Sequence, residues 1–230
     1  MYHGIYSFQG FIFLLPAILF AFYAQARVKM TFNKYIRVGN TRGLTGSQVA
    51  RYILDRNGLF DIEVEHIGGY LTDHYDPRNR VLRLSSNVYS GTSIAAISVA
   101  AHEAGHALQH AKGYTPLVIR NQIVPVVSFA SQLVWPLVFV GLILGNGWLI
   151  DVGILFYVGA VLFQIITLPV EYNASSRALN QLVDSGLIVD SEIKYSKDVL
   201  NAAALTYVAA AAVSIAQLFR LLLIRNSSRD

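Results

Sequence analysis

The chain of 230 residues has no cysteine, which excludes disulfides, thiolate metal sites and a cysteine nucleophile. Charge is scarce as well: 14% of the residues are charged, against about 25% in a typical soluble domain, while 54% are hydrophobic. This balance disfavours a soluble enzyme. The charges lie in blocks between long uncharged stretches, which indicates a bilayer and not nucleic acid as the partner. Any metal must be held by His, Asp or Glu, and three of the six histidines fall within nine residues.

Four apolar stretches are long enough, or nearly so, to cross a bilayer, which takes about 20 residues. We expect membrane spans at residues 5–26, 123–144 and 149–170. A fourth stretch, residues 202–224, is rich in alanine and contains Arg220, so it either spans fully or is only partly inserted. The sequence therefore predicts three to four transmembrane helices.

Basic residues indicate the orientation of the first span. None precedes it, and four follow it directly, namely Arg27, Lys29, Lys34 and Arg37. Such a cluster is retained in the cytoplasm, so we interpret the span as an uncleaved anchor with its N-terminus outside. Residues 27–122 and 171–201 are then cytoplasmic, and the uncharged connection at 145–148 is outside.

The cytoplasmic segments predict an α+β arrangement. Thr45 or Ser47 caps a helix that runs through Arg56, and Thr92 or Ser93 caps a second helix from Ile94 to about Ala111. Between them, alternating apolar residues and turn signals predict a small antiparallel sheet with strands near 62–66, 70–75 and 81–85. A helix is expected from Glu171 through Val183, and another after Asp190. The predicted fold is one integral-membrane domain over residues 1–230, mainly helical.

The second capped helix carries His102-Glu103-Ala104-Gly105-His106. Side chains four residues apart are neighbours on a helix, so His102 and His106 can present both imidazoles to one ion. Glu103 then lies beside the ion as a general base, and zinc with an open position acidifies water to a pKa of about 7. The pattern alone fits an incidental histidine pair on a solvated helix equally well. The small apolar residues at 95–101 favour a helix buried beside a cleft.

His110 extends the histidine stripe without joining the ligand set. Metzincin-type sites require glycine and histidine where this chain has Gln109 and Lys112, which excludes that class. We therefore expect His110 to be a helix-end residue or a neighbour of a ligand.

Glu171 is the best candidate for a third ligand. Two predicted crossings separate it from His106, and an even number of crossings returns the chain to the same face of the membrane. Asp73 and Asp76 are rival ligands, but turn chemistry beside Pro77 is the favoured interpretation of both.

The chain resembles the gluzincin-type integral-membrane metallopeptidases, a group that includes the HtpX protease and the CAAX-prenyl endopeptidases. The resemblance lies in the order of the helix with His102 and His106, two spans and then Glu171-x-x-Ala174. A closer resemblance, to the YugP-like family of bacterial membrane zinc metallopeptidases, covers most of the chain after residue 60. It rests on four segments, namely LTDHYDP at 71–77, the helix at 100–110, TLPVE at 167–171 and AAALTY at 202–207. The resemblance implies a bacterial plasma membrane protein.

The same resemblance implies one zinc ion per chain, bound by His102, His106 and Glu171, with Glu103 as the base. The chain departs from the HtpX pattern at Ser175, where that group has aspartate. A carboxylate that orients a ligand histidine is then missing or supplied differently. Candidate substitutes are Asn173, Asp184 and Asn201.

The substrate side is less defined by the sequence. A peptide can add to a sheet edge next to the metal, and the strand at 81–85 is a candidate edge, with an ordinary half-buried strand as the equal alternative. A stabiliser of the oxyanion is also needed, and the candidates are Tyr207, Asn201, Arg177 and His74. Arg177 lies roughly opposite Glu171 on their helix, so a structural pair is favoured for it.

The leading hypothesis is a zinc-dependent endopeptidase in the membrane that cleaves peptide or membrane-protein substrates at the cytoplasmic face. The alternative is a scaffold or adaptor that keeps the metallopeptidase fold with little or no turnover. A small transporter is disfavoured, because Arg220 is the only ionisable residue in the middle of a predicted span. A membrane-protein partner and a homo-oligomer both stay open.

Overall fold

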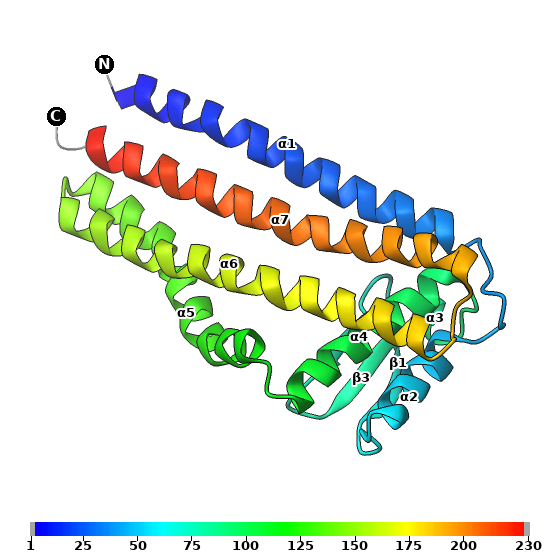
Figure 1. The fold of residues 1–230 in the computed structure, drawn as a ribbon. Helices are drawn as coiled ribbons and strands as arrows, with labels where there is room; N and C mark the ends of the chain where they lie inside the picture. Colours follow the sequence, from blue (N-terminus) through cyan, green and yellow to red (C-terminus); the bar gives the residue numbers. More distant parts are fainter. Residues whose placement is uncertain (1–2, 228–230) are drawn as a thin grey trace. The chain divides into compact units, whose positions relative to one another are not determined.

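The computed structural model describes residues 3–227, and for residues 3–10 it describes the helix but not the side chains. This part of the chain forms seven helices and three strands (Figure 1). The helices are α1 (His3–Tyr35), α2 (Gly46–Arg56), α3 (Ser86–Tyr89), α4 (Ile94–Ala111), α5 (Thr115–Ile143), α6 (Gly147–Asp184) and α7 (Asp190–Ser227), and the strands are β1 (Glu63–Ile67), β2 (His74–Asp76) and β3 (Val81–Ser85).

The described chain divides into two compact units. The helical unit comprises residues 3–25, 119–169 and 206–227, and the sheet unit comprises residues 26–118 and 170–205. The three strands and all of α2, α3 and α4 belong to the sheet unit, and α1, α5, α6 and α7 contribute residues to both units.

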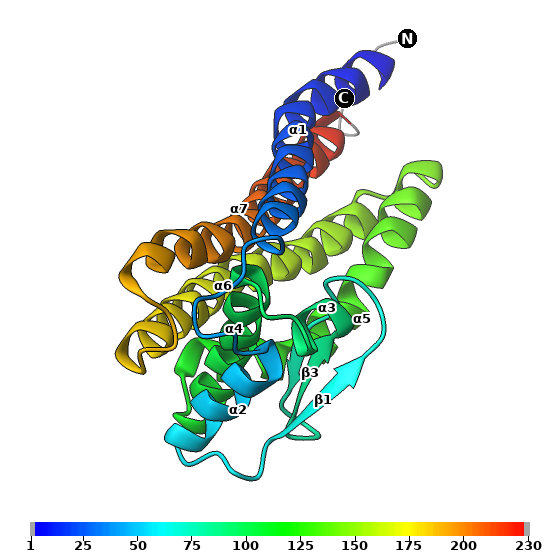
Figure 2. The same cartoon turned by 90° about the vertical axis from the view of Figure 1, so that its right-hand side faces the viewer.

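The sheet has the strand order β1-β3-β2, with β2 antiparallel to β3 and β1 parallel to β3. The small sheet of the sequence prediction is present, but it is mixed and not wholly antiparallel. Figure 2 shows it beside α4, with α2 packed close by. The difference arises because β1 does not form a hairpin with β2, so β3 comes to lie between them.

The helices of the sheet unit begin at the predicted caps. Thr45 and Gln48 form a reciprocal capping box at α2, and the Ser93 hydroxyl accepts a hydrogen bond from the Ala96 N–H at α4. Gly58 and Gly113, which follow these two helices, have positive φ angles of 75° and 60°. Such ends are predictable from sequence because the partners lie within a few residues.

Four helices in residues 3–227 are long and apolar enough to cross a membrane. Their candidate spans are Phe11–Tyr35, Thr115–Ile143, Gly147–Asp184 and Asp190–Ser227. Only 11% to 22% of the residues in the most apolar window of each are buried. Exposed apolar surface on this scale requires an apolar environment, which a lipid bilayer supplies.

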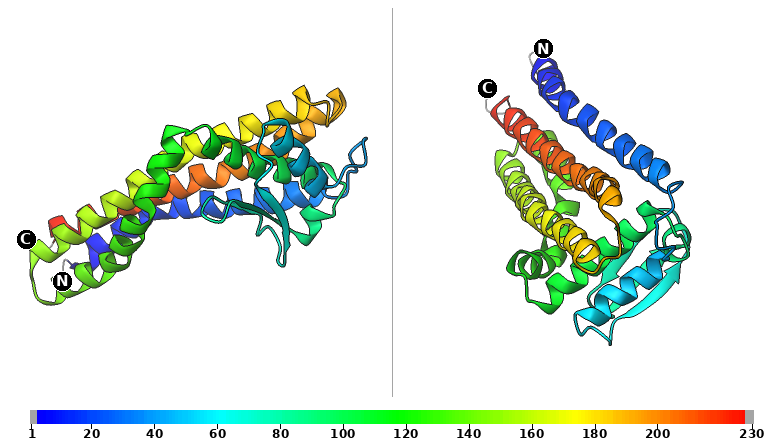
Figure 3. Two further views of the ribbon diagram at one scale, coloured as in Figure 1. Left: turned by 90° about the horizontal axis from the view of Figure 1, so that it is seen from below. Right: turned by 45° about the vertical axis from the view of Figure 1, so that its right-hand side comes forward.

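The helical unit has its own packing contacts. Val134, Val138, Ile150, Ile154 and Leu221 form a buried cluster among α5, α6 and α7. Near the α5–α6 connection, the Arg225 guanidinium of α7 donates two hydrogen bonds to the Asp151 carboxylate of α6, at 2.6 and 2.8 Å. In the views of Figures 1 and 3, α7 lies between α1 and α6.

Two helices are longer than expected. The predicted span at 149–170 and the predicted helix after Glu171 form the single helix α6, and the segments before and after residue 201 form the single helix α7. No loop separates the predicted span from Glu171, so Glu171 lies on the same helix as that span. The short helix α3 was not expected, since four residues carry no periodic signal.

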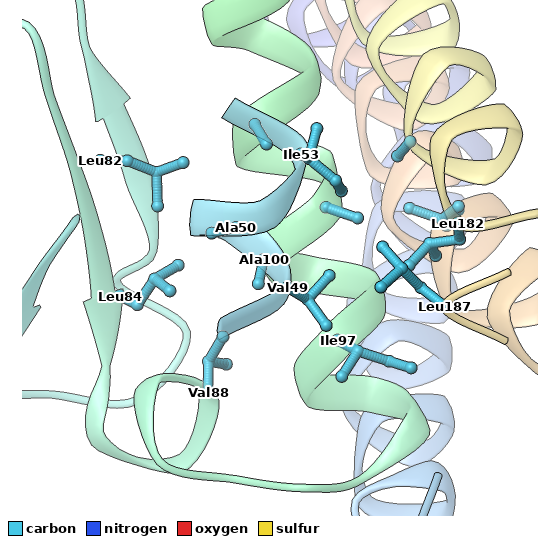
Figure 4. Packing of buried hydrophobic residues seen from close by; sticks show 14 of the residues in the cluster. Val49, Ala50, Ile53, Leu82, Leu84, Val88, Ile97, Ala100, Leu182 and Leu187 are labelled. Atoms are coloured by element: carbon cyan, nitrogen blue, oxygen red, sulfur yellow. The ribbon is translucent and has the colours of Figure 1, made fainter. Parts of the chain in front are cut away.

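The hydrophobic core of the sheet unit is built mainly around α2 and α4. Figure 4 shows the α2 side chains of Val49, Ala50 and Ile53 between strand residues and the side chains of α4. The core also includes Leu182 and Leu187 from the end of α6 and the loop after it. Burial on most sides holds α4 at a fixed position, and α4 carries the histidines.

Candidate metal centre

The metal helix of the sequence prediction is α4, and its buried face explains its composition. Small residues, including Ala100, Ala101 and Ala104, are fully buried there. His102 and His106 lie one turn apart with ring centroids 4.8 Å from each other. Only 11% and 13% of their side-chain areas are exposed. The helix thus places two imidazoles side by side in a nearly enclosed position.

Glu171 of α6 meets both rings. Its Oε2 atom lies 3.3 Å from His102 Nε2 and 3.5 Å from His106 Nε2, and its side chain is 2% exposed. The close approach of the helices depends on Gly105, where an added Cβ would lie 2.6 Å from the carbonyl oxygen of Ala174. The absence of a side chain at Gly105 therefore lets Glu171 reach the histidine pair.

The three side chains fit a zinc ion. Their candidate ligand atoms all lie within 4.8 Å of one another, and imidazole nitrogen with carboxylate oxygen is a donor set that zinc takes. Zinc bonds of about 2.0–2.2 Å in a tetrahedron separate neighbouring ligand atoms by about 3.3–3.6 Å. The two distances from Glu171 Oε2 to the histidine Nε2 atoms, 3.3 and 3.5 Å, match this range, and three such ligands would leave a coordination position open.

Glu103 lies beside the ligand group without belonging to it. The backbone N–H of Tyr75 in β2 donates a hydrogen bond of 3.0 Å to Glu103 Oε2, which fixes the carboxylate. Burial raises the pKa of Glu103 to about 7, with a further contribution from the nearby negative charge of Glu171. Position and environment are those of a group that takes up and releases protons near neutral pH.

Each histidine has a partner on its other ring nitrogen. The Ser175 hydroxyl lies 3.2 Å from His102 Nδ1, and Gln109 Oε1 lies 3.0 Å from His106 Nδ1. Ser175 itself therefore occupies the position next to His102 for which the sequence suggested substitutes. Sequence reasoning missed Gln109, although its spacing of three residues from His106 on one helix was an available signal.

The three proposed substitutes for the missing carboxylate do not contact His102 or His106 in the hydrogen bonds described. Asn173 accepts hydrogen bonds from Gln109 and Arg177, at 3.0 and 2.7 Å. The backbone carbonyl of Asp184 accepts from Arg56, and Asn201 is exposed. The pairing of Arg177 with Asn173 matches the structural role that its helical position favoured.

The remaining candidates lie beside the site or away from it. His110 Nδ1 lies 2.8 Å from the Tyr75 hydroxyl, so His110 neighbours the strand that holds Glu103. The exposed ring of His74 contacts the Thr72 carbonyl. Tyr207 belongs to the helical unit, and a role for it in stabilising an oxyanion stays a prediction.

The rival carboxylates have other partners. Asp73 accepts hydrogen bonds from the Ser85 N–H and hydroxyl, at 2.7 and 3.0 Å. Asp76 accepts from the N–H groups of Arg78 and Asn79, which is the turn chemistry favoured by the sequence. Neither belongs to the group of three candidate ligands among the described residues.

The prediction that the strand Val81–Ser85 is a sheet edge open to a substrate peptide was wrong. β3 pairs with β1 on one side and with β2 on the other, so both of its backbone edges are occupied. The strand is central because its residues are apolar on both faces: Val81, Leu82 and Leu84 are all buried. The edges of the sheet are β1 and β2.

Comparison with known proteins gives one family and one close relative. Residues 10–226 match the model of the family described as "Putative neutral zinc metallopeptidase". The chain is 54% identical over 222 residues to "Putative membrane protease YugP" of Bacillus subtilis (strain 168), which covers 96% of this chain and 98% of the relative. No solved structure gives a significant match.

Proposed function

Because the chain belongs to the zinc metallopeptidase family whose model matches residues 10–226, we propose that it is an integral-membrane, zinc-dependent endopeptidase. One observation carries the proposal: His102, His106 and Glu171 converge from two helices beside the buried carboxylate of Glu103. His102, His106 and Glu171 are the ligands of one zinc ion per chain. This arrangement leaves a position for water and substrate next to Glu103.

In the proposed reaction, the zinc ion, Glu103 and Tyr75 have separate roles. When bound, zinc supplies Lewis acidity, which polarises a carbonyl and acidifies water. Glu103 accepts the proton of the attacking water and delivers it to the amine that leaves when the peptide bond breaks. Tyr75 holds the Glu103 carboxylate through its N–H, so that the base keeps one orientation while the proton moves.

The reaction takes place at the cytoplasmic face of a bacterial plasma membrane, on peptide or membrane-protein substrates. The support is the cluster of basic residues that follows the first span, together with the even number of crossings between His106 and Glu171. The Bacillus subtilis relative carries the name "Putative membrane protease YugP", which supports the membrane setting and the protease activity of the proposal. The layout proposed is one domain with cytoplasmic segments at 27–122 and 171–201.

The decisive experiment compares zinc content and cleavage in purified full-length protein. Glu103→Gln keeps the shape of the side chain but cannot accept a proton, so we expect bound zinc to stay and cleavage of unfolded casein to fall at least 100-fold. Glu171→Gln removes the charge of a proposed ligand, so we expect both the zinc content and the cleavage to fall. Glu63→Gln, an exposed glutamate on β1, is the matched control with unchanged zinc and activity.

Three outcomes would contradict the proposal or a part of it. Wild-type protein that holds zinc without cleaving any unfolded substrate would support the scaffold alternative. Cleavage that persists in Glu103→Gln would remove Glu103 as the base, and an unchanged zinc content in Glu171→Gln would remove Glu171 from the ligands.

A further inference from the structure

Gln109 is a fully buried polar residue that the proposed mechanism does not use. It lies on α4 one turn after His106, and its amide contacts three groups. Gln109 Oε1 lies 3.0 Å from His106 Nδ1, and Gln109 Nε2 donates to the Val170 carbonyl at 2.8 Å and to Asn173 Oδ1 at 3.0 Å. The amide therefore joins the helix of the two histidines to the residue directly before Glu171.

The chemistry of its neighbours fixes the orientation of the Gln109 amide. The Val170 carbonyl can only accept a hydrogen bond, so the amide nitrogen must face it. Asn173 Oδ1 also accepts from Arg177 Nε, a group that can only donate, at 2.7 Å. The direction of the hydrogen bonds is thus fixed both at Val170 and at Arg177. With the opposite orientation of the amide, Gln109 Oε1 would face the carbonyl oxygen of Val170.

The fixed amide determines the tautomer of His106. With its nitrogen toward Val170, Gln109 presents its oxygen to His106 Nδ1, so Nδ1 must carry the proton as donor. In the neutral ring, Nε2 then keeps its lone pair, and Nε2 is the atom that faces Glu171 at 3.5 Å. A histidine that binds a metal through Nε2 needs this form of the ring.

We propose that Gln109 is a positioning residue that holds His106 in its metal-binding tautomer and ties the Val170–Glu171 segment to α4. The inference rests on the proposed zinc site and names a residue that prepares it. Partners of this kind typically change metal affinity by about 10- to 100-fold when they are removed.

The test uses full-length protein in detergent and measures zinc affinity by competition with a chromophoric chelator. Gln109→Met keeps the length of the side chain without its hydrogen bonds, and Gln109→Asn is too short to reach both His106 and Val170. We expect each to bind zinc about 10- to 100-fold more weakly, and the visible absorption of the cobalt-substituted protein to change. A purely structural role would lower the melting temperature without altering the cobalt spectrum.

The controls are Gln181→Met and Gln181→Asn, because Gln181 lies on α6 and contacts Asn57. Both should keep wild-type zinc affinity and cobalt spectrum. If Gln109→Met does not fold, Gln109→Asn gives the answer alone. Folded Gln109 variants with wild-type zinc affinity would overturn the role of Gln109 and leave the zinc site intact, whereas wild-type protein without zinc affinity would overturn both.

Discussion

Two side chains of the candidate metal centre, Glu103 and His106, are held by partners that admit only one arrangement of hydrogen bonds. The N–H of Tyr75 can only donate, so it fixes one oxygen of Glu103. A buried polar group without a partner costs about 1–3 kcal/mol, which is the penalty that such contacts avoid. Because these contacts come from the chain itself, we expect the side chains of the site to be ordered before an ion or a substrate binds.

Asp76 stabilises the turn that follows β2, and β2 carries Tyr75. Its carboxylate accepts hydrogen bonds from the Asn79 side chain at 2.7 Å and from Arg83 at 3.0 Å, as well as from two backbone N–H groups of the turn. The hydrogen bonds from Asn79, followed by that from Arg83, lower the pKa of Asp76 well below its ordinary range. The charged form is therefore the one that stabilises the fold.

Asp76→Ala should lower the free energy of unfolding by about 1 kcal/mol at pH 7, where the hydrogen bonds are lost. Because the folded pKa is depressed, the contribution is present above the unfolded pKa of about 3.9 and is lost as the pH falls below it. Thermal unfolding of the metal-free protein at pH 7 and pH 3 measures this difference. Asp55→Ala, on the exposed surface of α2, is the control with little effect at either pH. A gap between wild type and Asp76→Ala that widens in acid would contradict the assignment.

How much of the candidate site the sequence predicts depends on how many residues separate the side chains that meet there. The spacing of His102 and His106 is local, so a helix alone is enough to bring them together. The position of Glu171 was expected from the even number of crossings and the family resemblance. Contacts such as that of Ser175 with His102, across 73 residues, depend on how two helices pack, and no pattern in the sequence indicates this.

At the scale of elements, the site depends on how closely α4 approaches α6. Gly105 is the point of contact, with Ala174 opposite it. Where a strand forms depends on neighbouring residues in the sequence, but the order of the strands in the sheet does not. The alternation of apolar residues predicted where the strands occur. The parallel pairing of β1 with β3, with β2 lying between them in the sequence, instead follows from the packing of the whole sheet on α4.

Gly105→Ala separates intrinsic helix propensity from packing. In a helix interior, alanine is favoured over glycine by about 1 kcal/mol, so propensity alone predicts a more stable protein. The added Cβ would lie 2.6 Å from the Ala174 carbonyl oxygen, which belongs to the backbone and cannot rotate away. We expect packing to dominate, with a loss of about 1–3 kcal/mol in unfolding free energy and weaker zinc binding as Glu171 moves from the histidines.

The measurements for Gly105→Ala are thermal unfolding and zinc competition on the same purified sample. Gly39→Ala is the matched control, because an added Cβ at Gly39 meets nothing within 4 Å. A Gly105→Ala protein as stable as the control, with wild-type zinc affinity, would show that α4 and α6 do not need this close contact.

For the whole molecule, the division of the chain agrees with the proposed path through the membrane. The chain leaves the sheet unit after residue 118 and re-enters it at residue 170, and the greater part of the candidate spans Thr115–Ile143 and Gly147–Asp184 lies between these points. Two crossings joined by the short connection at 144–146 would return the chain to one face of the membrane. The candidate ligands His102, His106 and Glu171 all lie in the sheet unit, so the proposed topology places them together in the cytoplasm.

The absence of cysteine makes this topology directly testable. Every labelled thiol in the chain, once it is purified after labelling, must come from the introduced residue, so the parent chain is a control without background. Asn146 and Lys112 are both exposed, the first between α5 and α6 and the second at the end of α4. In intact bacteria, a membrane-impermeant maleimide should label Asn146→Cys at once and Lys112→Cys only after the membrane is permeabilised. The reverse pattern would place the candidate zinc ligands outside the cell, because Lys112 directly follows α4, the helix that carries His102 and His106.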